Sequence, residues 1–254
     1  MTQNALEILN SLYGYESFRG HQAEIIEHVS AGNNALVLMP TGGGKSICYQ
    51  IPSLLREGVG IIISPLIALM QDQVDAMQQL GVKAAFLNSS LSHSEQNLIE
   101  QELLSGQLDL LYIAPERLIQ SYTLDLLSRC QLALFAIDEA HCVSQWGHDF
   151  WSAYLKIPVL NDIHPDVPKI ALTATATALV KNDIIENLQL TSAKIFSGSY
   201  YRDNLYIRIL KKEDIRSGIL NLLKSIDEPA IVYVGTRKDT VQYARFLSSH
   251  QIKA

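Results

Sequence analysis

The chain has 254 residues, of which 48% are hydrophobic and 18% are charged, so it can bury a substantial core. Its formal net charge of −6 does not indicate a nucleic-acid binder, and no apolar run approaches the roughly 20 residues that span a bilayer. The first residues, MTQNALEILN, lack a basic stretch followed by an apolar one, which disfavours secretion. We therefore expect a cytoplasmic protein (bacterial cytosol or nucleoid) or a nuclear one, without a membrane partner.

Three cysteines, Cys48, Cys130 and Cys142, are an odd number and form no CxxC pair. This usage is typical of a reducing compartment and disfavours a structural zinc site. We expect Cys48 and Cys130 to be core residues and the chain to hold no zinc.

Short apolar runs predict buried strands of a parallel sheet, because consecutive positions are apolar and both faces of each strand are then covered. The predicted strands are residues 35–39, 59–64, 108–113, 132–137, 168–173 and 193–197. Helical patterns alternate with them, including residues 66–81 and residues 92–106, the latter capped by Ser92 or Ser94. The alternation predicts an α/β doubly wound parallel sheet.

The pattern starts again beyond residue 204. Residues 205–210 and 230–237 are predicted strands, and helices are predicted over residues 213–226 and 239–250. Charge also changes sign: residues 1–199 carry 10 Lys and Arg against 20 Asp and Glu, whereas residues 200–254 carry 10 against 6. The change of sign indicates a domain boundary or a basic face; the alternative is a more soluble tail.

We predict one complete domain over residues 1–203 and the incomplete start of a second α/β domain over residues 204–254. Two strands are too few for independent stability. This segment is therefore expected to pack on the first domain, to associate with another chain, or to fray.

The stretch MPTGGGKS follows the first predicted strand and precedes a helix, and it ends with Gly42, Gly43, Gly44, Lys45 and Ser46. Glycines allow backbone N–H groups to converge on phosphate oxygens, and the helix N-terminus adds partial positive charge. Lys45 can reach the β and γ phosphates, and the Ser46 hydroxyl can hold Mg²⁺. Met39 stands where the strict GxxxxGK[ST] pattern has glycine. The alternative is a glycine turn with a surface lysine.

Two adjacent acids, Asp138 and Glu139, end the predicted strand 132–137. A phosphate-loop nucleotidase needs an acid near Mg²⁺ and a group that orients or deprotonates the attacking water. Asp138 suits the first role and Glu139 the second; the alternative is two acids that cap the next helix. A metal site of His141, Cys142 and His148 fits neither HExxH nor a zinc-finger spacing.

The motifs TGGGKS, DEAH and LTATAT occur in the order found in superfamily 2 helicases. Four further stretches, YGYESFRGHQ, SPLIALMQDQV, YIAPERL and DEAHCVSQWGHDF, resemble the RecQ DNA helicases. The resemblance covers residues from about 6 to 254. It implies a RecA-like fold with part of a second RecA-like domain, ATP and Mg²⁺ as cofactors, and 3′-to-5′ unwinding of DNA.

By position, the resemblance implies that Tyr15 and Arg19 sandwich the adenine and that Gln22 reads its edge. Thr41 and the glycine-rich loop that follows it would hold the triphosphate, with Lys45, Asp138 and Glu139 as catalytic residues.

The resemblance also implies which residues meet DNA, single-stranded or partly duplex. His141, Gln145, Thr173 and Thr175 would couple the nucleotide state to the DNA-contacting surface. Aromatic faces stack on bases without regard to sequence, which suits the aromatic-rich loop from Ser144 to Trp151. Trp146 and Phe150 would touch single-stranded DNA, with His148 and Trp151 in the same loop; ordinary core packing is the alternative for the aromatic residues.

The sequence departs from the family in three ways. Trp151 stands where the family has an arginine that relays DNA binding to ATP turnover; a stacking surface is the alternative role for this residue. Asp203 replaces a usual proline. The second-domain arginine that reaches the γ-phosphate is also missing from the 254 residues.

We weigh two main hypotheses: the ATPase part of a RecQ-type helicase, and an ATP- and DNA-binding module with negligible turnover that regulates a full-length relative. A small-molecule phosphate-loop kinase would leave the aromatic loop and LTATAT unexplained.

Overall fold

The computed structural model describes residues 2–146, 151–174, 176–198, 205–209, 211 and 214–253. The chain divides into two compact units, residues 1–201 and 202–254, which are treated separately below. The boundary predicted between residues 203 and 204 lies outside the described residues.

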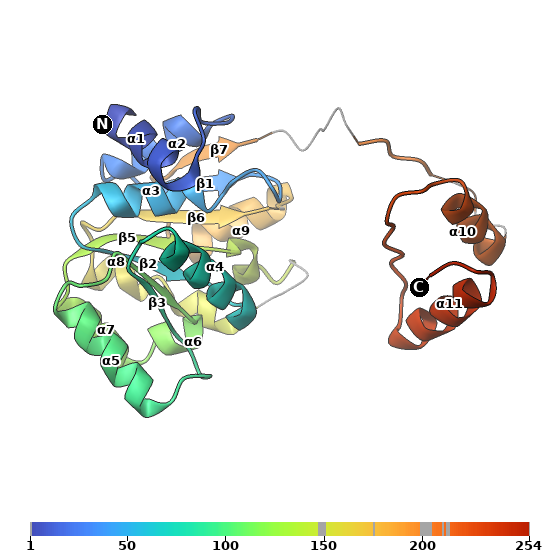
Figure 1. Ribbon diagram of the computed structural model, residues 1–254. Helices are drawn as coiled ribbons and strands as arrows, with labels where there is room; N and C mark the ends of the chain where they lie inside the picture. Colours follow the sequence, from blue (N-terminus) through green and yellow to red (C-terminus); the bar gives the residue numbers. More distant parts are fainter. Residues whose placement is uncertain are drawn as a thin grey trace. The chain divides into compact units, whose positions relative to one another are not determined.

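The first unit is built on a seven-stranded sheet in which all paired strands are parallel, with the order β3-β4-β2-β5-β6-β1-β7 (Figure 1). The strands are β1 (Ala35–Leu38), β2 (Val59–Ile63), β3 (Ala84–Leu87), β4 (Leu110–Ile113), β5 (Leu132–Ile137), β6 (Lys169–Thr173) and β7 (Lys194–Ser197). The six strands predicted from the sequence are present, and β3 is an additional one. The prediction of a RecA-like α/β sheet is confirmed.

Helices and short helical turns connect the strands. They are α1 (Thr2–Tyr13), α2 (Gln22–Ser30), α3 (Ile47–Leu55), α4 (Ile67–Gln79), α5 (His93–Leu104), α6 (Pro115–Leu118), α7 (Ser121–Ser128), η1 (Ala140–Val143), η2 (Ser152–Lys156), α8 (Val159–Ile163) and α9 (Ala178–Asn187). Ser92 caps α5, and its hydroxyl accepts a hydrogen bond from the backbone N–H of Glu95. No helix in these ranges or in the second unit's described residues is long and apolar enough to cross a membrane.

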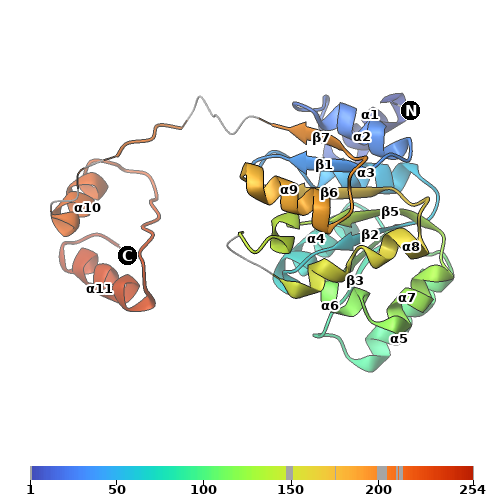
Figure 2. The ribbon, with the colours of Figure 1, turned by 180° about the vertical axis from the view of Figure 1, so that it is seen from behind.

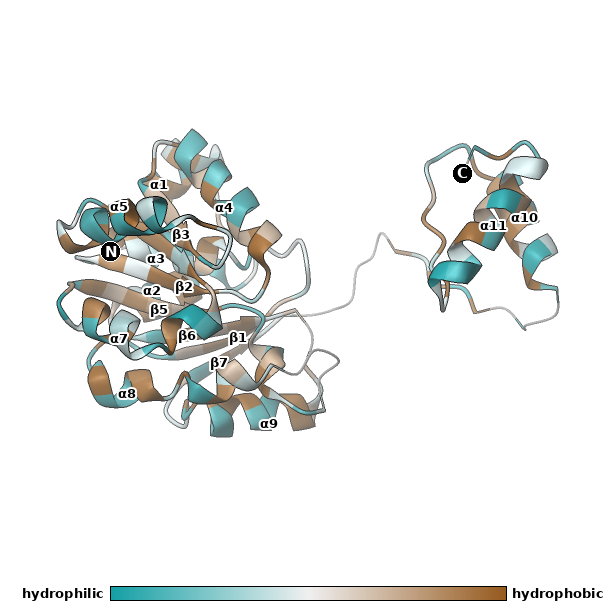
Figure 3. Cartoon of the chain, turned by 90° about the horizontal axis from the view of Figure 1, so that it is seen from below, coloured by the Kyte–Doolittle hydropathy of each residue, from teal (hydrophilic) through white to brown (hydrophobic). Residues whose placement is uncertain are grey.

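Alternate residues of each central strand point to opposite faces of the sheet, and each face has its own core. Val37 and Ile62 pack with side chains of α2, α3 and α4, whereas Leu36 and Ile61 pack with those of α5, α7, α8 and α9. Figure 2 shows the second of these layers from behind, and Figure 3 shows apolar strands between helices of mixed hydropathy. Because both faces are covered, the strands read as continuous apolar runs.

The carboxyl ends of the parallel strands lie at one edge of the sheet, and this edge positions the candidate site. The glycine-rich loop follows β1, the two acids follow β5, and β6 lies between these strands and ends at Thr173. The backbone N–H of Met39 donates to the Thr173 carbonyl at 3.2 Å, which joins the start of the loop to the end of β6. Ligands of open α/β sheets bind at this edge.

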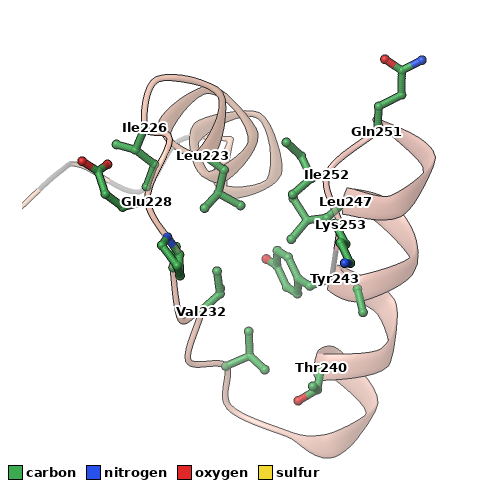
Figure 4. A pocket seen from close by; sticks show the side chains of 14 residues that line it. Leu223, Ile226, Glu228, Val232, Thr240, Tyr243, Leu247, Gln251, Ile252 and Lys253 are labelled. Carbon is green, nitrogen blue, oxygen red and sulfur yellow. The ribbon is translucent and has the colours of Figure 1, made fainter.

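The second unit contains α10 (Ile215–Lys224) and α11 (Arg237–Ser249), near the helices predicted there. Asp214 caps α10 and Thr236 caps α11. Between the helices and residues 226–234 lies an apolar groove of about 410 Å³ (Figure 4). Leu223, Val232 and Leu247 are among the residues that line it.

The two strands predicted in this unit are wrong for the described residues. Neither 205–209 nor 230–236 forms a strand, and Ile209 and Ile231 are 93% and 79% exposed. A strand needs a neighbour for its backbone hydrogen bonds, and an apolar pattern alone does not supply one.

Candidate nucleotide site

The glycine-rich loop adopts a backbone that only glycine accepts readily. Gly42 and Gly44 both have φ of 77°, in the left-handed region, and the Gly43 N–H donates to the Pro40 carbonyl at 3.0 Å. A Cβ on Gly43 would stand 2.9 Å from that carbonyl oxygen. The three glycines therefore allow a tight loop directly before α3, whose N-terminus carries partial positive charge.

Lys45 lies across this loop. Its Nζ donates to the carbonyl oxygen of Met39 at 3.3 Å, and its side chain is half-buried. Ser46 follows immediately before α3, and its Oγ accepts a hydrogen bond from Gln73 Nε2 at 3.4 Å. An ammonium and a hydroxyl thus lie at the end of the loop, directly before α3.

The segment before α2 closes one side of the loop. The Arg19 guanidinium lies 5.3 Å from the centre of the Tyr15 ring, a cation–π distance. Tyr15 is 45% exposed, which leaves ring surface open to a ligand. A small cavity of about 80 Å³ lies between these side chains, Gln22 and the glycines of the loop. The residues assigned to adenine and phosphate binding are therefore neighbours.

Gln22 is buried and already bonded to protein atoms. Its Oε1 accepts from the Arg19 backbone N–H at 2.9 Å, and its Nε2 lies 3.2 Å and 3.3 Å from the carbonyl oxygens of Gly43 and Gly44. In this arrangement the carboxamide braces the loop against the Tyr15–Arg19 segment. The Gln22 amide can exchange these two bonds for hydrogen bonds to a ligand.

Asp138 lies at the end of β5 and is 7% exposed. Burial, followed by the charge of Glu139, raises the pKa of Asp138 from 3.8 to about 6. Its Oδ1 accepts one hydrogen bond, from the Glu139 N–H at 2.9 Å. A buried carboxylate next to a second carboxylate favours a cation at this position.

Glu139 has φ of 47°, an uncommon left-handed conformation for a residue with a side chain. Its Oε2 lies 3.2 Å from His141 Nδ1, and the same nitrogen lies 2.9 Å from Thr173 Oγ1. Hydrogen bonds with Cys142 and Glu139 raise the pKa of His141 from 6.5 to about 10. This contact connects the acid pair to the end of β6.

Further hydrogen bonds hold the backbone of Asp138 and the loop that follows the acid pair. The hydroxyl of Tyr154, a buried residue of η2, donates to the Asp138 carbonyl oxygen at 2.9 Å. Ser144 Oγ donates to Asp183 Oδ2 of α9 at 2.6 Å and accepts from the Trp146 N–H at 3.2 Å. These bonds fix the start of the aromatic-rich loop against α9.

The aromatic-rich loop is described only in part. Trp146 is 76% exposed and Gln145 is exposed as well. Trp151 is half-buried, and its backbone N–H donates to the Cys142 carbonyl at 2.8 Å. Its side chain packs against the core on the α7–α9 side of the sheet. His148, Phe150 and Thr175 lie outside the described residues.

The oxygens present suit Mg²⁺ held jointly by protein and phosphate. Ser46 offers a hydroxyl and Asp138 a carboxylate, and Mg²⁺ in nucleotide sites usually has one or two protein ligands, with phosphates and waters completing the shell. Within the described ranges, no group of three or more His, Cys, Asp or Glu side chains could hold a metal on its own.

Sequence reasoning missed Gln73, Tyr154 and Asp183, each of which supports a site residue. A weak signal existed for Gln73, because it lies in the buried stripe of α4 between Met70 and Met77. A polar residue in an apolar stripe needs a buried partner. Tyr154 and Asp183 gave no such signal.

The profile of the DEAD/DEAH box helicases matches residues 19–182, which include the phosphate loop, the acid pair and Thr173. The chain belongs to the DEAD/DEAH box helicases.

Among relatives of this helicase domain, the ATP-dependent DNA helicase RecQ of Pasteurella multocida is 40% identical over the whole chain, and that of Bacillus subtilis is 42% identical. The chain spans 40% and 44% of these two relatives. The resemblance to RecQ helicases predicted from the motifs is confirmed by these relatives.

A solved structure, the DUF1998 helicase MrfA, superposes with a TM-score of 0.70 over 97% of this chain and 40% of its own length. At 15% sequence identity, this likeness concerns the fold.

Proposed function

We propose that the chain is the ATP-binding part of a RecQ-type DNA helicase, which hydrolyses ATP and unwinds DNA with 3′-to-5′ polarity. The observation that carries the proposal is the meeting of the phosphate loop, the Asp138–Glu139 pair and His141 at one edge of the sheet. The similarity to RecQ helicases supports it.

In this proposal Tyr15 and Arg19 hold the adenine, while the loop N–H groups and Lys45 hold the phosphates. Mg²⁺, held by Ser46 and Asp138, would neutralise charge on the β and γ phosphates. Glu139 would orient the attacking water and accept its proton as the bond to the γ-phosphorus forms and the bond to ADP breaks. His141 would hold the Glu139 carboxylate in place.

DNA is the proposed partner, single-stranded or partly duplex. Exposed Trp146 offers a stacking face next to Ser144, which is anchored on α9. The Glu139–His141–Thr173 contact is a physical connection between the acid pair and the segment after β6. Such a connection would let the two ligands influence each other.

A second candidate is an ATP- and DNA-binding module with negligible turnover. The observation in its favour is that the described residues of the second unit form two helices without a sheet. An exposed apolar segment such as residues 230–234 would then associate with a second copy or another chain.

The test measures ATP affinity and ATP hydrolysis, each with and without single-stranded DNA, for the wild type, Lys45→Ala and Glu139→Gln. We expect Lys45→Ala to lose affinity, and Glu139→Gln to bind ATP and lose hydrolysis. Binding without hydrolysis in the wild type, even when DNA is present, would favour the second candidate. No ATP binding at all would refute both.

A further inference from the structure

A buried polar cluster lies beneath the phosphate loop, between α3, α4 and β4, and Gln73 of α4 is at its centre. Gln73 Oε1 accepts hydrogen bonds from the hydroxyls of Tyr49 and Tyr112 at 2.9 Å and 3.0 Å. Gln73 Nε2 donates to Ser46 Oγ at 3.4 Å. The cluster thus connects α4 and β4 to the hydroxyl that ends the loop.

The two tyrosines determine which way the Gln73 carboxamide points. Tyr112 accepts a hydrogen bond from Gln50 Nε2 at 3.1 Å, so its own proton is available to Gln73 Oε1. Burial raises the pKa of Tyr112 to about 12 and holds the pKa of Tyr49 well above its usual value, so both hydroxyls remain donors. Gln50 Nε2 also donates to Gln73 Oε1, at 3.4 Å. Since three donors face the oxygen, the NH₂ group is turned towards Ser46.

We propose that Gln73 is a positioning residue that orients the Ser46 hydroxyl as a ligand of the nucleotide's magnesium ion. A donor on one lone pair of Oγ restricts rotation of the side chain and leaves the other lone pair for a cation. The proposal rests on the proposed function, because it requires nucleotide with Mg²⁺ at the loop. Partners that hold a metal ligand in place typically change metal affinity about 10–100-fold when they are removed.

A purely structural role would have a different signature. If Gln73 only satisfied the two tyrosine hydroxyls, its loss would lower the melting temperature and weaken nucleotide binding equally with and without metal. A role at Ser46 changes the metal-dependent part alone, because the loop N–H groups and Lys45 still bind phosphate in the absence of Mg²⁺.

The experiment measures the affinity of the full chain for a fluorescent ATP analogue in Mg²⁺ and in EDTA, together with the melting temperature. The variants are Gln73→Ala and Tyr49→Phe, and the matched control is Gln71→Ala. Gln71 lies on the same helix and is exposed, and its Nε2 donates to Asp75 Oδ1 at 2.7 Å.

We expect Gln73→Ala to reduce the affinity in Mg²⁺ about tenfold and to change the affinity in EDTA less than twofold. Tyr49→Phe keeps the packing, and by loosening Gln73 it should give a smaller loss, about threefold, in Mg²⁺ only. If Gln73→Ala does not fold, Tyr49→Phe alone decides. Gln71→Ala should match the wild type in both conditions.

Equal losses in Mg²⁺ and EDTA, or no loss in either, would overturn the role of Gln73 while ATP binding by the wild type still supports the proposed function. A wild type that binds no ATP analogue would overturn both.

Discussion

Asp138 is the residue at which function and stability oppose each other most clearly. It is buried, and burial together with Glu139 raises its pKa from 3.8 to about 6. The ionised form is therefore disfavoured in the folded protein. The stabilisation by the protonated form is fully present below about pH 3.8 and is lost as the pH rises through about 6. At neutral pH the ionised carboxylate lowers the stability of the folded protein, and a bound cation would offset this loss.

We accordingly expect Asp138→Asn to stabilise the metal-free protein at about pH 8. The change in pKa corresponds to about 3 kcal/mol, and Asn keeps the hydrogen bond from the Glu139 N–H, so a gain of about 1–3 kcal/mol is expected. The gain should shrink towards zero near pH 4. Urea unfolding in EDTA at several pH values measures it. A constant difference between the two proteins at every pH would contradict the role of burial.

A second prediction at the residue scale concerns Gln22. Gln22→Ala should weaken ATP binding more than GTP binding, because the bonds from its amide to Gly43 and Gly44 can be exchanged for the adenine edge. Titrations of the wild type and the variant with both nucleotides give the ratio. Equal losses for ATP and GTP would make Gln22 a brace of the loop and not a reader of the base.

At the scale of elements, the phosphate loop can be tested by comparing two glycines. Gly44 and Gly81 have φ of 77° and 81°, so an alanine at either position costs about 1 kcal/mol of backbone strain. A Cβ on Gly44 would collide with Gln22 Nε2, whereas a Cβ on Gly81 meets nothing within 4 Å. Gly44→Ala should therefore reduce ATP affinity at least about tenfold, and Gly81→Ala should not. ATP titration and urea unfolding measure the two effects; normal affinity in Gly44→Ala would show that the loop tolerates the collision.

The aromatic-rich loop gives a further prediction. Trp146→Ala should weaken binding of single-stranded DNA about 5–100-fold, the range of one lost stacking contact, and leave ATP affinity and melting temperature unchanged. Leu98→Ala, which also removes exposed apolar surface, is the control. Fluorescence anisotropy with a labelled oligonucleotide at several salt concentrations is the measurement. A loss of ATP affinity or stability would indicate that Trp146 packs within the protein.

Most elements of the first unit could be predicted from the sequence, because continuous apolar runs and glycine or serine signals mark their ends. β3 was missed because its sequence, Ala-Ala-Phe-Leu, contains no β-branched residue, and its position beside β4 comes from tertiary packing. The phosphate loop and the acid pair were visible as motifs. The contacts of Tyr154 with Asp138 and of Asp183 with Ser144 were not, because no local pattern marks pairs that are 16 and 39 residues apart.

The strands predicted after residue 204 illustrate the opposite failure. Residues 230–234 alternate between exposed Ile231 and Tyr233 and half-buried Val232 and Val234, as a strand would. The alternating pattern predicts which side chains a strand would bury, but the described residues provide no neighbouring strand for the backbone hydrogen bonds. Without such a partner the apolar residues 230–234 do not form a strand.

At the scale of the whole molecule, we expect this chain to bind ATP, to hydrolyse it slowly, and not to unwind DNA. Arg237 and Arg245 both belong to α11, where the resemblance predicts no catalytic arginine. A missing arginine at the γ-phosphate reduces the rate roughly 10³-fold or more, or about 4 kcal/mol of transition-state stabilisation. A steady-state ATPase assay and a strand-displacement assay measure both activities. Fast DNA-stimulated hydrolysis with strand separation would contradict this prediction.

The same assay extends to a chimaera in which the corresponding sequence of a RecQ relative follows residue 254. Turnover should rise in that chain, and Trp151→Arg should raise the part of it that DNA stimulates. No effect of Trp151→Arg would fit the packing of Trp151 against the core, which leaves the ring little room to act as a relay.

In a sheet that is buried on both faces, polarity does little to fix the register of each strand, whereas in a half-exposed sheet it does. Sliding one strand by a single residue would exchange its two faces, and here both are apolar, so polarity alone opposes the slip weakly. Shape opposes it instead. Gly60 in β2 lies directly against Ser53 of α3, and a Cβ at that point would collide with the serine side chain. A slip would bring Val59 or Ile61 to this position, where its side chain would collide with Ser53. Gly60 therefore opposes a slip of β2 along its neighbour β5, the strand that carries the acid pair at its end.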